Sequence, residues 1–393
     1  MLVIQEVNTQ ALEQVFVNLV ARIYAGNPHY IRPLNKEVLE LFDVTKNKHL
    51  KKGTAQKWLV LNEEQIAIGR IAAFVNPKYI TKGTEYPTGG IGLFECVNNQ
   101  EAANLLFNTA KEWLIKHEVE AMDGPINPGD RDKWWGLMVE GFEAEPVYGM
   151  SFNPSYYQAL FENYGFKNYY NQYFYTMQVH DPLPEKIRER HAKFKAKADY
   201  SARHLTKNKL AKYAQDFATV YNAAWAQHGE GKEITAEQVL KLFNSMKPIM
   251  DEKTVWFAYY KEEPIAMFIN IPDINQYFKY FNGQLGLWQK IRLMWMKYRG
   301  ECKKLTGLAF GVVPKFQALG IDSFIIGEVS NFIPYHCQYT AYEMGWAGDW
   351  NPKMVNIYKN LGGKQSRRMI TYRYIFDENK HPFERHPLMD YKQ

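Results

Sequence analysis

The order of the predicted elements occurs twice along the chain, and this repetition constrains the fold more than any other feature. In each half a strand and an amphipathic helix precede a hairpin, a further strand and a closing run of helices and strands. The last helix of each half stops at an aromatic-x-Asn-x-Gly pattern, Phe161 to Gly165 and Tyr358 to Gly362. Asn and Gly favour a helix end by themselves, but the matching order before each stop favours two copies of one α/β unit of about 180 residues.

The break between the copies lies at the proline-containing segment 180–184, which a short basic helical stretch follows. We therefore predict an N-terminal domain over 1–180, a basic connector over 181–200, and a C-terminal domain over 201–393 with an insertion at 275–304. The fold class we expect is α/β (α+β). Each domain should hold a mixed, mostly antiparallel twisted sheet flanked by helices.

Composition excludes several classes of protein. Of 393 residues, 46% are hydrophobic and 23% charged, which is typical of a globular chain that buries its own core. Cys96, Cys302 and Cys337 are far apart and form no CxxC pair, so we expect neither a disulfide framework nor a Cys-rich zinc site. The chain has no run of 18 apolar residues and its start lacks a signal-peptide pattern, so we expect a cytoplasmic protein.

The net charge of +6 comes from two basic segments. Residues 183–212 contain ten Lys or Arg against three acidic residues, and residues 276–304 contain seven against one. The rest of the chain is therefore acidic, unlike a protein that presents a continuous basic face to nucleic acid. We do not expect nucleic acid as a partner.

A loop and helix in the second half carry a resemblance to a known family. From position 312 the chain reads V-V-P-K-F-Q-A-L-G-I, which matches V-x-P-x-x-[Q/R]-x-x-G, and Asn351, Tyr358 and Gly362 follow at the family's spacing. These residues resemble the GNAT superfamily of acyl-CoA N-acyltransferases. Gly-Pro-x-Asn-Pro at 124–128 and Asn-Pro-x-Tyr-Tyr at 153–157 make the chain similar to bacterial two-copy GNAT proteins of unknown substrate.

The resemblance implies acyl-CoA or acetyl-CoA as co-substrate, without a metal. The pyrophosphate would lie on backbone amides at the start of the helix after the loop, where the helix dipole favours an anion. Asp322 stands where the family has Gly or Ala. We expect it either to cap this helix or to weaken CoA binding, and in the second case an acyl-carrier protein would be the donor. The implied cofactor-binding residues are Val312, Val313, Gln317, Ala318, Leu319, Gly320, Ile321 and Asn351.

Acyl transfer from a thioester to an amine uses a base that deprotonates the amine and an acid that protonates the leaving thiolate. The resemblance implies Tyr358 as the acid, the alternative being a helix-end aromatic that packs on the sheet. Glu343, on a strand beside the expected cleft, is a candidate base, the alternative being a surface carboxylate. Asn351 should also cap the last helix.

The first half resembles the same fold without its phosphate loop. Residues 97–102, at the matching point, contain no glycine, so a pyrophosphate should not approach the backbone closely. Glu95 lies on the strand before this loop, where such enzymes often carry a base, and burial would raise its pKa. The alternative is a hydrogen-bonded structural carboxylate.

The insertion is expected to form an amphipathic helix with an apolar arc that lies between basic edges. One interpretation is a helix packed on the protein's own core by this arc, and the other is a wall of a lipid-acyl groove that contacts an anionic membrane surface. Leu293 and Met296 fall outside the arc. The arc contains Leu287, Trp288, Ile291, Met294, Trp295 and Tyr298, and its edges carry Lys290, Arg292, Lys297 and Arg299.

Together these features predict an N-acyltransferase that moves an acyl group, other than an aminoacyl group, from acyl-CoA or an acyl-carrier protein to a primary amine. The insertion favours a long-chain acyl group or a lipid-like amine, and peripheral membrane contact through residues 276–304. Two alternatives stay open: a tRNA-dependent aminoacyl transferase, and a non-catalytic GNAT-like binding or peripheral-membrane module.

Overall fold

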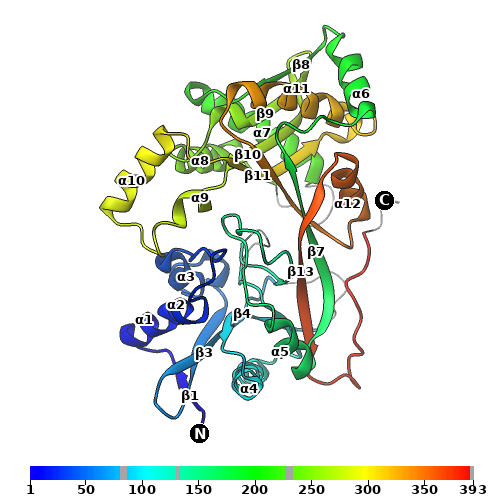
Figure 1. Cartoon of the computed structure of the whole chain (residues 1–393). Coiled ribbons are helices and arrows are strands. Elements are labelled where there is room, and N and C mark those ends of the chain that lie inside the picture. The colour runs from blue at the N-terminus through cyan, green and yellow to red at the C-terminus, as the bar shows by residue number, and fades with distance from the viewer. Residues whose placement is uncertain (80–85, 130, 132, 226–232, 390–393) are drawn as a thin grey trace.

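The computed structural model describes residues 1–79, 86–129, 131, 133–225 and 233–389, with the first copy in the lower and the second in the upper part of Figure 1. The first copy contains β1 (Val3–Glu6), α1 (Gln10–Asn18), α2 (Val20–Ile23), α3 (Asn35–Leu41), β2 (Thr54–Leu61), β3 (Ala67–Val75), β4 (Thr88–Cys96), α4 (Gln100–Lys116), β5 (Ala121–Gly124), β6 (Leu137–Glu140), α5 (Tyr157–Tyr164) and β7 (Lys167–Gln178). Helix α6 (Glu185–Lys195) follows. The second copy contains β8 (Tyr200–His204), α7 (Leu210–Trp225), α8 (Ala236–Met246), β9 (Val255–Tyr260), β10 (Glu263–Pro272), α9 (Asn275–Phe278), α10 (Leu287–Tyr298), β11 (Lys304–Val312), α11 (Ile321–His336), β12 (Ala341–Gly348), α12 (Pro352–Asn360) and β13 (Lys364–Ile375).

Within these described ranges, thirteen strands form one continuous sheet through both copies. The strand order is β1-β2-β3-β4-β5-β13-β7-β12-β11-β10-β9-β8, and β6 pairs with β13 beside this path. The β4–β5 and β11–β12 pairs are parallel, and the other pairs are antiparallel. The prediction of two copies, each with a mixed, mostly antiparallel sheet flanked by helices, is confirmed.

The last strands of the two copies are exchanged. β7 pairs with β12 of the second copy, and β13 pairs with β5 of the first, so each final strand lies beside the fifth strand of the other copy. β7 and β13 also pair with each other along most of their length, as the long strands at the right of Figure 1. The exchange joins the two copies into one sheet, while α6 lies within the predicted connector.

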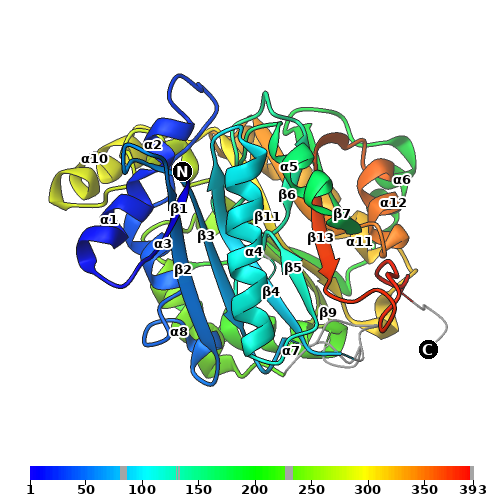
Figure 2. The ribbon, with the colours of Figure 1, turned by 90° about the horizontal axis from the view of Figure 1, so that it is seen from below.

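Helices pack on this sheet in both copies. α4 lies across β2, β3 and β4, as Figure 2 shows, and its buried residues recur at helical spacing. The connector helix α6 packs on α11 closely enough that a Cβ at Gly327 would come within 2.4 Å of the His191 ring. In the part of the chain that the structure describes, no helix is long and apolar enough to cross a bilayer.

Candidate active site

Strand β4 carries a bulge in the first copy. Its register with β3 shifts between Arg70, which lies opposite Glu95, and Ala72, which lies opposite Gly92. The bulge contains Leu93 at φ 49°, a conformation that few non-glycine residues adopt. Because a bulge bends its strand, β4 pairs with β5 over residues 88–90 and then leaves that pairing.

A cavity of about 90 Å³ lies beside the bulge. Its lining includes Glu95 of β4, Leu137 of β6 and Tyr157 of α5, together with Tyr30 and Arg32 from the α2–α3 loop. This volume is smaller than the roughly 150 Å³ that admits benzene. The cavity therefore suits a small reacting group rather than an alkyl chain.

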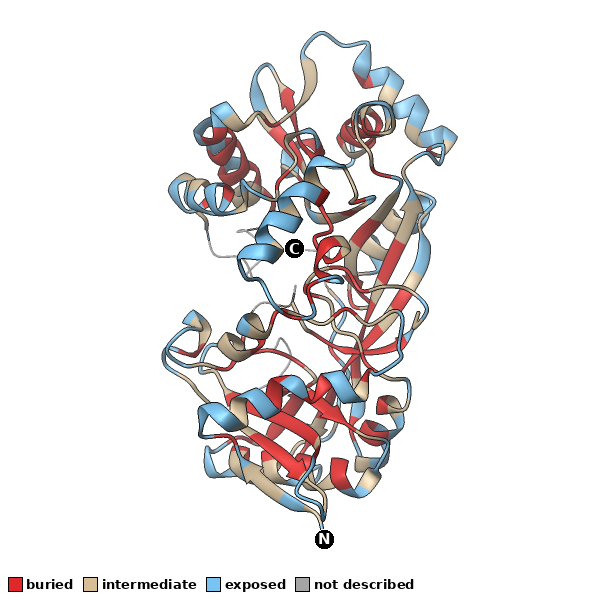
Figure 3. Cartoon of the chain, turned by 60° about the vertical axis from the view of Figure 1, so that its left-hand side comes forward, coloured by how far each residue is buried: buried red, intermediate tan, exposed pale blue. Residues whose placement is uncertain are grey.

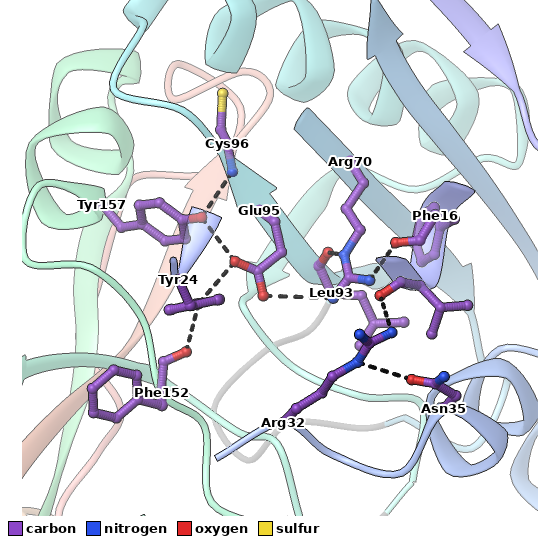
Figure 4. Close-up of polar contacts among 11 residues, drawn as sticks. Phe16, Tyr24, Arg32, Asn35, Arg70, Leu93, Glu95, Cys96, Phe152 and Tyr157 are labelled. Carbon is purple, nitrogen blue, oxygen red and sulfur yellow. Dashed lines mark hydrogen bonds and ion pairs between the residues drawn. The ribbon is translucent and has the colours of Figure 1, made fainter. Parts of the chain in front are cut away.

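The carboxyl of Glu95 is the centre of the polar wall (Figure 4). The hydroxyl oxygens of Tyr24 and Tyr157 each lie 2.8 Å from its Oε2. The Tyr157 hydroxyl also accepts the N–H of Cys96 at 2.8 Å, which fixes its orientation. Since Glu95 is 8% exposed, these hydroxyls replace most of the water that would solvate the carboxyl.

Arg70 neutralises Glu95 incompletely. Its Nη2 lies 3.5 Å from Glu95 Oε1, whereas Nη1 donates to Phe16 O at 2.6 Å and Nε donates to Leu93 O at 3.2 Å. Burial raises the pKa of Glu95, and the attraction of Arg70 and the tyrosine hydrogen bonds oppose that rise without cancelling it. The raised pKa expected for Glu95 is therefore confirmed.

The Tyr24 hydroxyl lies within hydrogen-bond distance of two acceptors. The Tyr24 hydroxyl oxygen lies 2.9 Å from Phe152 O in addition to its contact with Glu95, yet the hydroxyl has one proton to donate. A protonated Glu95 can donate to Tyr24 while Tyr24 donates to Phe152 O, so both contacts become hydrogen bonds. Burial raises the pKa of Tyr24 well above its usual value, so its hydroxyl stays protonated near neutral pH.

In the second copy the predicted phosphate loop leads from β11 into α11. Ala318 at φ 60° and Gly320 at φ 102° turn the chain, and no side-chain bond caps the helix at Gly320. The first N–H groups of a helix have no intrahelical acceptor, and in α11 no capping side chain replaces one. The Cδ of Arg190 in α6 lies 3.6 Å from the ideal Cβ position of Gly320, which brings a cation to this helix end. The loop fits a pyrophosphate, and Asp322 lies in the first turn rather than at the cap.

The first copy does not fit a pyrophosphate at the corresponding helix. The side chain of Asn99 caps α4, and its Oδ1 accepts the N–H of Ala102 at 3.0 Å. A side chain thus occupies the place where a phosphate oxygen would bind. The cavity lies in the first copy and the phosphate loop in the second.

The other residues predicted to bind the cofactor lie along β11 and the loop. Val312 O accepts a hydrogen bond from Gln317 Nε2 at 2.9 Å, and the N–H of Val313 donates to Ile265 O at 2.9 Å. Leu319 is exposed, whereas Ile321 is buried. Asn351 caps α12 by accepting the N–H of Met354 at 3.0 Å, which confirms its predicted capping role. Contact of these residues with CoA stays a prediction.

The structure places Glu343 on β12 and Tyr358 on the following helix, α12. Glu343 is 3% exposed, and its Oε1 pairs with Arg367 Nη1 at 2.7 Å, so the surface-carboxylate alternative is wrong. Burial raises the pKa of Tyr358, whose hydroxyl lies 3.6 Å from the ideal Cβ position of Gly345. The Tyr342 hydroxyl of β12 lies 2.6 Å from the ideal Cβ position of Gly307 in β11. The catalytic roles proposed for Tyr358 and Glu343 stay predictions.

Comparison of the sequence with known proteins finds relatives that match over nearly the whole chain. No protein-family model matches the chain. It is 26% identical over 375 residues to a bacterial ceramide synthase of Caulobacter vibrioides (strain NA1000 / CB15N), covering 93% of this chain and 95% of that protein. It is 22% identical over 379 residues to the protein YghO of Escherichia coli (strain K12), covering 91% and 92%.

Solved structures identify the fold of the chain. A tandem GNAT protein from the clavulanic acid biosynthesis pathway superposes with a TM-score of 0.55 at 11% identity, over 96% of this chain and 99% of that one. The chain has the tandem GNAT fold.

Sequence reasoning missed the residues that hold Glu95 within the first GNAT copy. Tyr24 and Arg70 come from a helix end and a neighbouring strand, and the sequence around them carries no signal. Tyr157 does belong to the Asn-Pro-x-Tyr-Tyr motif. Asn153 of this motif bonds both backbone groups of Met138, at 2.7 and 3.0 Å, and so positions the start of α5 and Tyr157.

Proposed function

We propose that this protein is an N-acyltransferase that joins a long-chain acyl group to the amine of a lipid-like base, with the amine reacting in the cavity beside Glu95. The buried Glu95 carboxyl, held by two tyrosine hydroxyls next to a strand bulge, is the observation that carries the proposal. The Caulobacter relative supports the choice of substrate, because a ceramide is an N-acylated long-chain amino alcohol.

Glu95 would act as the base. An amine is an ammonium ion in neutral water and must lose a proton before its nitrogen attacks a thioester carbon. A carboxylate whose pKa is raised by burial accepts that proton better than an ordinary carboxylate. The C–N bond then forms, the C–S bond breaks, and a proton lost from the nitrogen reaches the leaving thiolate. The net products are an amide, a free thiol and one proton.

The donor would be an acyl-CoA or an acyl-carrier protein. The helix start in the first copy is capped by Asn99, so the donor phosphate must bind elsewhere. The amides of residues 317–321 with Arg190 are the candidate seat, because they combine a helix N-terminus with a cation. The phosphate groups of the donor would bind this loop.

The direct test is synthesis of the amide. Purified protein is incubated with acyl-CoA of graded chain length, or with acyl-carrier protein, together with a long-chain amino alcohol. We expect an amide by mass spectrometry and free thiol in equal amount, with turnover rising with the chain length of both substrates. A short, polar primary amine serves as the control acceptor. Absence of amide with every donor would contradict the proposal.

A further inference from the structure

Helix α10, in the insertion of the second copy, presents its apolar arc outward. The residues of this arc are between 49% exposed, at Ile291, and 91% exposed, at Tyr298. Met296, from the opposite side of the helix, is 2% exposed, and Leu293 packs on the core. The helix is therefore held by the two residues outside the arc, and the interpretation that the arc packs on the protein's own core is wrong. Figure 3 colours most of α10 as exposed.

Cations flank the exposed arc. Lys290, Arg292 and Arg299 are exposed, and α10 contains no acidic residue. The guanidinium carbon of Arg299 lies 4.6 Å from the centre of the Trp295 ring, and Arg299 Nε pairs with Glu301 Oε1 at 3.3 Å. Large apolar side chains, two of them tryptophans, between cationic heads are the arrangement of a helix that lies in a lipid headgroup layer.

The same insertion touches the rim of the Glu95 cavity. The N–H of Asn35 donates to Gly283 O at 2.8 Å, and Arg32 Nε lies 2.8 Å from the ideal Cβ position of Gly283. Arg32 and Asn35 both line the cavity, and α10 begins at Leu287, shortly after this contact. Figures 1 and 2 both show α10 beside the helices of the first copy. The start of α10 therefore lies near residues that line the cavity.

We propose that α10 docks this protein on an anionic lipid bilayer, with the apolar arc in the headgroup layer and the flanking cations on lipid phosphates. The charges beside the arc favour a lipid bilayer over a second copy of the chain as the partner of this face. In a symmetric contact between two copies, the arc would face itself and bring Lys290, Arg292 and Arg299 against their own equivalents, which like-charge repulsion opposes. Lipid phosphates offer the complementary charge.

Vesicle binding tests this without any measurement of activity. The full chain is floated with vesicles of phosphatidylglycerol and phosphatidylcholine, or of phosphatidylcholine alone. The assay uses about 0.1 M salt, at which the Debye length is about 10 Å. We expect partitioning at least about tenfold stronger on the anionic vesicles, since each basic residue near the surface adds roughly fivefold. Failure to bind anionic vesicles would overturn the proposal.

Variants separate α10 from the rest of the surface. Trp288→Glu with Trp295→Glu should lower anionic-vesicle binding by more than about tenfold, because anionic groups replace the two exposed tryptophans that would enter the headgroup layer. Tyr335→Glu on α11, a residue 82% exposed, is the matched control and should bind like the unaltered protein. Circular dichroism checks that the double variant folds. Retained binding by the double variant, equal loss in the control, or lipid-independent dimers that the double variant abolishes would each overturn the proposal.

Discussion

Arg373 of β13 and Asp123 of β5 form a buried bidentate ion pair that joins the two copies. Arg373 Nε lies 2.6 Å from Asp123 Oδ1, and Nη2 lies 2.7 Å from Oδ2. The guanidinium carbon lies 3.6 Å from the centre of the Tyr169 ring, and Tyr79 donates a further hydrogen bond to Asp123 at 2.7 Å. The pair thus secures the exchanged strand in the first copy.

Breaking this pair should destabilise the whole chain. Arg373→Met leaves the buried Asp123 charge without its main partner, which costs about 3–5 kcal/mol of the free energy of unfolding. Lys167→Met is the control, because the Lys167–Glu378 pair is about half exposed and contributes at most about 1 kcal/mol. Denaturant unfolding measures both. Similar losses in the two variants would show that the Arg373–Asp123 pair has no special role.

Asp273 should make stability depend on pH. Burial raises its pKa to about 6, although the N–H groups of Tyr148 and Asn275 donate to its Oδ1. A raised carboxyl pKa favours the protonated form in the folded state. Its stabilising contribution is therefore complete below about pH 4, the unfolded value, and is lost as the pH rises through about 6, with a total of about 3 kcal/mol.

The substitution Asp273→Asn keeps the carbonyl acceptor and removes the titration. Denaturant midpoints from pH 4 to 7.5 should fall more steeply with pH in the unaltered protein than in the variant, since other groups titrate equally in both. Parallel pH profiles would mean that Asp273 titrates at its ordinary pKa.

Tyr157 should set the pKa of Glu95. Its hydrogen bond favours the ionised carboxyl, so Tyr157→Phe should raise the pKa of Glu95 and move the acidic limb of kcat/KM to higher pH. The loss of a hydrogen bond to a charged group should also lower kcat/KM by about tenfold or more. Tyr164→Phe, on the same helix, removes a hydroxyl that bonds Asn108 and should leave the limb in place. If the acidic limb of kcat/KM stays at the same pH in Tyr157→Phe, then Tyr157 does not set the pKa of Glu95.

Gly320 should matter for the donor rather than for the amine. Gly320→Ala places a side chain at φ 102° in the phosphate loop, and we expect the KM for acyl-CoA to rise about five- to tenfold as the strained backbone shifts. Gly362→Ala has a similar φ of 86°, with no atom within 4 Å of the added Cβ. It is the matched control. Equal KM values in the two variants would argue against a donor phosphate in this loop.

The local sequence pattern predicted the helices and strands, and the family resemblance indicated one residue of the site, Glu95. Helical spacing in α4 indicates which of its faces is buried, and Glu95 was found because the GNAT resemblance implies a base on the strand before the phosphate loop. Its partners could not be found in this way. Tyr24 and Tyr157 lie 71 and 62 residues from Glu95 in sequence, so only tertiary structure brings their hydroxyls to the carboxyl.

The strand exchange and the direction of α10 lay beyond sequence reasoning for the same reason. β7 and β13 are both long and aromatic, so their alternation does not state which fifth strand each one joins. The apolar arc of α10 was visible in the sequence, but a helical wheel does not state whether that arc faces the core or the solvent. Burial of Met296 opposite the arc decides it.

The central claim is that Glu95 takes the proton from the amine. Glu95→Gln keeps the size of the side chain and cannot accept a proton, so single-turnover amide formation at pH 7 should slow by about 10²- to 10⁴-fold. Glu343→Gln alters the buried partner of Arg367 and tests the other candidate base in the same assay. A Glu95→Gln enzyme with the unaltered rate, and above all one paired with a slow Glu343→Gln enzyme, would contradict the account.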